Sequence, residues 1–215
     1  MRELFSMDGL VGRALYRATD LLTLSCLWVI CSLPLFTMGA STAALYTMTL
    51  RIVRNEEGKI GSGFFRAFKD NFRQATWIHI LTMLLMAAAG VYQVAVGVLP
   101  AGMQPVFRGA SLLFWVLCLM EVLFVYPVQA RFENRTLNIM KNAWLIAAGN
   151  LPVFFLVLVI TGSPVILFRL HTGLFVRLFP LLLFFGPGVI AWLNSFLFQH
   201  CFKRYITEEE EETEA

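Results

Sequence analysis

The segment Leu21–Leu50 most constrains what this chain can fold into, because it contains no charged residue. As one straight helix it would extend about 45 Å at about 1.5 Å per residue, whereas the hydrocarbon core of a bilayer is about 30 Å thick. Pro34 lacks a backbone donor and Gly39 tolerates any backbone angle. We therefore expect a helical hairpin that is broken at Pro34–Gly39. The sequence leaves open whether this hairpin crosses the membrane or is a re-entrant pair shielded by neighbouring helices.

Four further segments are apolar and close to the length of about 20 residues that crosses a membrane as a helix. They are Thr76–Val98, Gly109–Ala130, Leu151–Phe168 and Phe175–Leu197. The composition agrees, because 58% of the residues are hydrophobic and 14% are charged. Soluble domains have about 45–50% apolar and about 25% charged residues. We therefore predict an all-α, polytopic membrane bundle of about six hydrophobic helices, in a single membrane domain over residues 1–206.

Basic residues indicate the side on which each loop lies, since Lys and Arg concentrate in cytoplasmic loops. With the hairpin, all 17 Lys and Arg residues fall on one side except Arg108, Arg169 and Arg177. A single span in place of the hairpin would move the N-terminal arginines to the other side as well. We therefore predict a multi-pass cell-membrane protein with both termini in the cytoplasm. Because the basic residues serve topology, we expect no nucleic-acid partner.

Three segments outside the spans have distinctive sequence patterns. Residues 61–73 predict an amphipathic helix with basic residues on one side and, on the other, Phe64, Phe65, Phe68 and Phe72. We interpret it as an interfacial helix on the inner leaflet, with a docking surface for a partner as the alternative. Residues 132–149 predict a cytoplasmic linker helix. The acidic segment 207–215 predicts a disordered cytoplasmic tail, with binding to a basic partner as the alternative.

Polar residues inside the apolar segments are costly, so they are functional candidates by default. Glu121 lies near the middle of Gly109–Ala130. Its carboxyl group either holds two helices together by hydrogen bonds or lines a cavity as a proton or substrate contact. His79 and Asn194 are possible partners, although nothing in the sequence pairs them with Glu121.

Signatures of catalysis are missing from the sequence. No GxxxxGK[ST], HExxH or GxSxG motif occurs, and these mark nucleotide, zinc-protease and serine-hydrolase sites. The cysteines and histidines also lack the spacing of metal ligands or of CxxC pairs. We therefore expect no enzymatic activity, no metal and no cofactor.

Several short motifs together resemble one known family. The first half contains Trp28, Ser32–Pro34, Thr37–Tyr46, Glu56-Glu57 and Phe64–Thr76, and the second half contains Tyr126-Pro127, Arg131–Asn134, Lys141–Ala143, Asn150–Pro152 and Phe185–Pro187. Over nearly the whole chain this pattern resembles the YesL family of bacterial multi-pass membrane proteins, long classed as a domain of unknown function. Its members are typically encoded beside carbohydrate ABC importers and glycan-degrading enzymes in Gram-positive bacteria. The resemblance implies a bacterial cell-membrane protein that contacts lipid and permease subunits, and it supplies no catalytic residues.

Two hypotheses follow from these observations. The first is a non-catalytic accessory subunit or regulator of a carbohydrate ABC importer. Its candidate partner-contact or fold-determining residues are Pro34, Thr37, Gly39, Phe64, Phe65, Phe68 and Phe72. The second is a substrate-binding transporter or channel component in its own right. It predicts a pocket among the helices around Glu121, His79 and Asn194.

Overall fold

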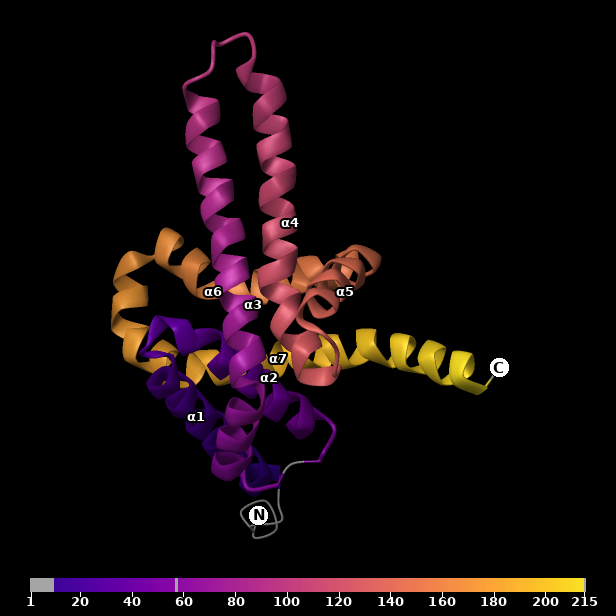
Figure 1. Ribbon diagram of the computed structural model, residues 1–215. Coiled ribbons are helices and arrows are strands. Elements are labelled where there is room, and N and C mark those ends of the chain that lie inside the picture. The colour runs from indigo at the N-terminus through magenta and orange to yellow at the C-terminus, as the bar shows by residue number, and fades with distance from the viewer. Residues whose placement is uncertain (1–9, 57, 215) are drawn as a thin grey trace.

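The backbone folds entirely into helices over the residues that a computed structural model of the chain describes, 10–56 and 58–214, with side chains described over 12–56 and 58–205 (Figure 1). No strand occurs within those residues. In chain order the helices are α1 (Leu10–Ser32), the short 3₁₀ helix η1 (Leu35–Thr37), α2 (Met38–Val53), α3 (Ile60–Gly97), α4 (Gln104–Arg131), α5 (Thr136–Gly149), α6 (Leu151–Leu170) and α7 (Thr172–Glu214). The predicted all-α class is therefore confirmed.

Five of these helices, α1, α3, α4, α6 and α7, are long and apolar enough to cross a membrane. The protein is therefore membrane-embedded. The predicted number of six is not confirmed, because α2 has 16 residues. At about 1.5 Å per residue such a helix extends about 24 Å, less than the hydrocarbon core of about 30 Å.

The chain breaks between α1 and α2, within the charge-free segment. Pro34 has an extended backbone conformation, with φ −76° and ψ 114°, and η1 follows directly. The two helices that flank the break contact each other, since the indole nitrogen of Trp28 donates a hydrogen bond of 3.1 Å to the hydroxyl of Thr42.

Helix α3 joins two segments that the sequence predicts as separate. Residues 61–73 form its first turns, and the same helix continues without a break to Gly97. The physical reason is local, because no proline and no charged cluster interrupts the chain between Arg73 and the apolar residues that follow. The expected interfacial helix is thus the polar end of a long helix of 38 residues.

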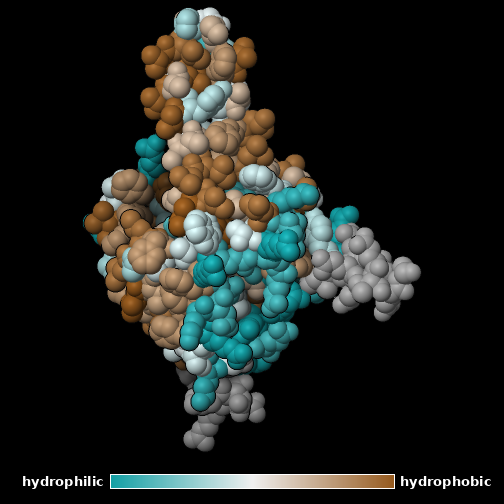
Figure 2. All heavy atoms as spheres, viewed as in Figure 1, coloured by the Kyte–Doolittle hydropathy of each residue, from teal (hydrophilic) through white to brown (hydrophobic). Residues whose placement is uncertain are grey.

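Helices α3 and α4 form an antiparallel pair that projects beyond the rest of the bundle (Figure 1). Few polar contacts join the two helices along the projection. The Ser111 hydroxyl donates to the side-chain oxygen of Gln93, and the Cys118 thiol lies 3.9 Å from the carbonyl oxygen of Leu85. Hydrophobic residues cover most of the projecting pair, whereas hydrophilic residues gather lower on the molecule (Figure 2).

Part of the hydrophobic core lies where α2, α4 and α7 meet. Phe124 and Phe198 are fully buried, and their rings meet edge to face with centroids 5.0 Å apart. The Tyr46 ring also meets Phe198 edge to face, with centroids 5.9 Å apart. Edge-to-face contacts of this kind favour one defined packing of the helices.

The last three helices attach to this core. Helix α5 occupies most of the predicted linker segment and packs on α4, where the Trp144 indole donates a 3.1 Å hydrogen bond to the Leu117 carbonyl. Helix α7 continues through the acidic end of the chain to Glu214, whereas the sequence predicts a disordered tail over 207–215. Glutamate is a good helix former, which suits this continuation.

Candidate functional site

The turn after α1 is held by the side chain of Thr37. Its hydroxyl lies 2.5 Å from the carbonyl oxygen of Cys31 and 2.7 Å from that of Pro34. Both carbonyl groups lie at the end of α1 or just beyond it, where the helix offers no backbone donor. Thr37 therefore satisfies backbone acceptors at the break, which gives it a structural part in the turn that Pro34 begins.

Gly39 lies at a close approach between α2 and α3. A Cβ atom at this position would lie 2.6 Å from the backbone oxygen of Ala75 and 2.7 Å from the Cβ of His79. The neighbouring Ala40, Ala43 and Ala44 are fully buried as well. This run of small residues is therefore used for packing within the protein, and it is not available to a second membrane protein.

The four phenylalanines at the start of α3 have different environments. Phe64 is fully buried and Phe68 is partly buried against the core, while Phe65 is 54% and Phe72 is 36% exposed. The Phe64 and Phe68 rings stack at 6.5 Å, and the Phe68 and Phe72 rings meet at 5.5 Å. One part of this face thus holds α3 to the bundle, and Phe65 remains free for lipid or a partner.

His79 belongs to a buried polar pair between α3 and α4. Its Nδ1 lies 2.8 Å from the hydroxyl of Tyr126, and the two side chains are 8% and 7% exposed. The backbone of Gly39 packs directly against His79. The pair therefore links α3 to α4 at the point where α2 packs against α3.

Glu121 is 1% exposed, and neither of its carboxyl oxygens has a hydrogen-bond partner. An ionised carboxylate without a partner at such a position would be very costly, so the carboxyl group is expected to carry a proton. One role expected from the sequence is a hydrogen bond from Glu121 to another helix. Within the described residues the Glu121 carboxyl group makes no such bond.

Asn194 is fully buried on α7 and links three helices. Its amide nitrogen donates to the hydroxyl of Thr161 on α6 at 2.9 Å and to that of Tyr46 on α2 at 3.3 Å. Its side-chain oxygen has no partner. The three predicted polar residues thus belong to separate arrangements and do not form the single pocket that the second hypothesis predicts.

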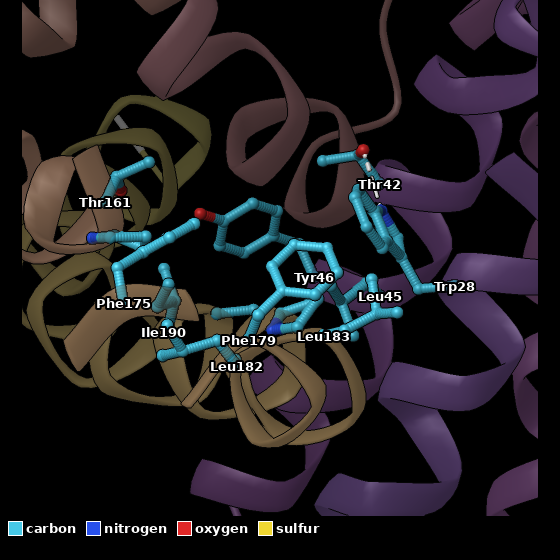
Figure 3. Close-up of a pocket in the computed structure, with 14 residues that line it drawn as sticks. Trp28, Thr42, Leu45, Tyr46, Thr161, Phe175, Phe179, Leu182, Leu183 and Ile190 are labelled. Carbon is cyan, nitrogen blue, oxygen red and sulfur yellow. Dashed lines mark hydrogen bonds between the residues drawn. The ribbon is translucent and has the colours of Figure 1, made fainter. Parts of the chain in front are cut away.

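A cavity of about 330 Å³ adjoins the Asn194 contacts. Tyr46 and Trp28 form one side of it and side chains of α7, among them Phe179, form the other, with the Tyr46 hydroxyl directed toward Thr161 (Figure 3). None of Glu121, His79 and Asn194 lines it. Its walls are almost entirely apolar, which suits a hydrocarbon chain better than a polyhydroxylated ligand.

Two further close contacts were not foreseen from the sequence. The Ser25 hydroxyl accepts a 2.8 Å hydrogen bond from the backbone N–H of Gly188, and a Cβ at Gly188 would lie 2.5 Å from the Leu21 oxygen. Pro187 within α7 was the available signal, because a proline followed by a glycine disturbs a helix and permits close approach. No group of three or more potential metal ligands occurs within the described residues.

Comparison with known proteins gives one match. The model of a family described as "Protein of unknown function, DUF624" matches residues 21–91, a segment that contains the break, the Gly39 contact and the phenylalanines of α3. The comparisons with curated proteins and with solved structures gave no match. The YesL family was classed as this same domain of unknown function. The resemblance is thereby confirmed over residues 21–91, the part of the chain that the family model matches.

Proposed function

We propose that this protein is a non-catalytic membrane subunit that associates with the permease of a carbohydrate ABC importer through the α3–α4 pair. The observation that supports it is the exposure of apolar side chains along the projecting part of both helices (Figure 2). Val91 and Val94 on α3 are 70% and 71% exposed, and Leu112 and Leu113 on α4 are 71% and 62% exposed. This surface is covered either by lipid alone or by another membrane protein.

Small residues on α3 favour a protein neighbour. Ala87 and Ala88 are exposed near the middle of the apolar part of α3, and a Cβ at Gly90 would meet nothing within 4 Å. Lipid chains gain nothing from small side chains, whereas a second helix needs them for close approach. The class of the neighbour comes from the resemblance, because YesL-family members are typically encoded beside carbohydrate ABC importers.

A carbohydrate-binding transporter in its own right has less support. The cavity beside Tyr46 is apolar, and the hydroxyls of Tyr46 and Thr161 that adjoin it already accept hydrogen bonds from Asn194. A sugar site needs several free polar groups that converge on the ligand.

The proposed membrane subunit has both termini in the cytoplasm, as predicted from the basic residues.

Photocrosslinking in native membranes tests the association. A photoreactive amino acid at Val94 or Leu112 is expected to crosslink to a permease subunit. The matched control positions are Phe155 and Val159 on α6, which are similarly apolar and are 59% and 58% exposed. Crosslinks to lipid alone from all four positions would contradict the proposal, and so would equal crosslinking to the permease from α6.

A further inference from the structure

A polar cavity of about 420 Å³ lies at the end of the bundle where α2 ends, α3 begins and α4 ends. This end coincides with hydrophilic surface below the projecting pair (Figure 2). The charged and amide side chains that line the cavity are Arg51, Arg66, Asp70, Asn71, Gln129, Arg131 and Glu133. Its volume falls in the range of about 300–1,000 Å³ that is usual for small-molecule sites.

Gln129 gives this cavity a buried and unsatisfied amide group. The side chain is 5% exposed, and both its nitrogen and its oxygen lack a hydrogen-bond partner. Buried side-chain amides in folded proteins nearly always have partners. An amide in this state at a cavity wall has one unused acceptor and unused donors for a ligand that enters the cavity.

The charges around Gln129 favour an anion. Arg51 and Arg131 form no ion pair within the described part of the chain, whereas Arg66 is 3.7 Å from Asp70. Arg54 and Arg131 line a smaller cavity of about 130 Å³, and Arg131 also lines the larger one. Burial and the charge of Arg131 lower the pKa of the Arg54 guanidinium. Glu56 pairs with Arg54 at 3.1 Å, so Arg51 and Arg131 are the cations whose repulsion a bound anion would relieve.

We propose that this cavity binds a phosphate group carried on a hydroxylated molecule, with Arg51 and Arg131 as charge partners and Gln129 as the buried amide contact. Guanidinium groups suit phosphate because their N–H groups match pairs of phosphate oxygens. The free oxygen of Gln129 and the carboxylates of Asp70 and Glu133 accept hydrogen bonds, so they suit hydroxyl groups that accompany the phosphate. Glycerol phosphate has this chemistry, both as a free molecule and as the headgroup of phosphatidylglycerol. The site does not depend on the proposed importer association.

Binding is tested with the full-length protein in a neutral detergent and in vesicles. The soluble probes are inorganic phosphate and glycerol 3-phosphate, measured by titration calorimetry. The lipid probes are vesicles of phosphatidylglycerol or of phosphatidylcholine, measured by retention of labelled lipid. Saturable binding of a soluble probe identifies a free phosphate compound as the ligand, and selective retention of phosphatidylglycerol alone identifies a lipid headgroup. Absence of binding by the soluble probes together with equal retention of both lipids would overturn the proposal.

Variants separate a built site from general surface charge. Arg51→Gln and Arg131→Gln are each expected to weaken binding about tenfold, because each removes a charge-assisted contact. The matched control is Arg73→Gln, since Arg73 is an exposed arginine of α3 that does not line the cavity, and binding should change less than about twofold. Equal weakening by Arg73→Gln would contradict the proposal.

The Gln129→Leu variant separates loss of binding from loss of folding. Without ligand this variant should have a higher unfolding midpoint than the wild type, because it removes two buried atoms without partners. It should nevertheless bind the phosphate probe at least about fivefold more weakly. Unchanged affinity in a folded Gln129→Leu protein would overturn the role of Gln129.

Discussion

Replacement of Gly39 by alanine tests the packing of α2 on α3. The added Cβ would lie 2.6 Å from the Ala75 backbone oxygen and 2.7 Å from the His79 Cβ, and both atoms belong to the core-facing side of a long helix that cannot move locally. Overpacking of this kind costs about 1–3 kcal/mol. The higher helix propensity of alanine offsets about 0.5–1 kcal/mol of that cost. We expect a net loss of about 1–2 kcal/mol in the free energy of unfolding.

The assay is reversible unfolding in mixed micelles of dodecyl maltoside and increasing SDS, followed by tryptophan fluorescence. The matched control is Gly90→Ala on α3, where the added Cβ meets nothing within 4 Å, so a gain of about 0.5–1 kcal/mol is expected. The two variants should therefore change stability in opposite directions. Wild-type stability of Gly39→Ala, or a loss in both variants, would refute the reasoning about close approach at Gly39.

Three further substitutions test buried polar groups with the same unfolding assay. Tyr126→Phe should cost about 1–3 kcal/mol, because it leaves the buried His79 ring without its 2.8 Å partner; a cost near zero would mean that the pair is not formed. Glu121→Leu should raise the free energy of unfolding by about 1–3 kcal/mol, since its oxygens have no partner, and a marked loss would reveal a partner that the structure lacks. Ser25→Ala should cost about 1 kcal/mol by removing the acceptor of the Gly188 N–H, and no change would show that this hydrogen bond contributes nothing.

Hydropathy was sufficient to predict the four single spans that correspond to α3, α4, α6 and α7, because spans are set by length and apolar content alone. The break near Pro34 was predictable for a similar reason, since proline acts on the backbone locally. The length of α3 was not predictable in this way. A change from polar to apolar side chains at Thr76 marks where the environment of the helix changes, and it does not stop helical hydrogen bonding. The short α2 illustrates the same limit, because a charge-free segment does not reveal how its length divides between two helices.

The candidate site was predictable only as single residues. Glu121, His79 and Asn194 are conspicuous as polar groups in apolar segments, but their neighbours come from other helices. His79 meets Tyr126 and Asn194 meets Tyr46 and Thr161, pairings that no local spacing encodes. Gln129 was missed because it stands at the end of a span beside Arg131, where polar residues are common and attract no notice. Only the fold brings it to a cavity wall.

The mass of the particle that the protein forms shows directly whether the protein associates with a permease. The protein would be extracted from its native membranes with a mild detergent, purified through a small tag at its C-terminus, and measured by native mass spectrometry. We expect a defined complex with permease subunits, which is lost when Gly90 is replaced by leucine while the protein stays folded. A folded protein that is released only as a lone monomer, with or without that substitution, would contradict the account.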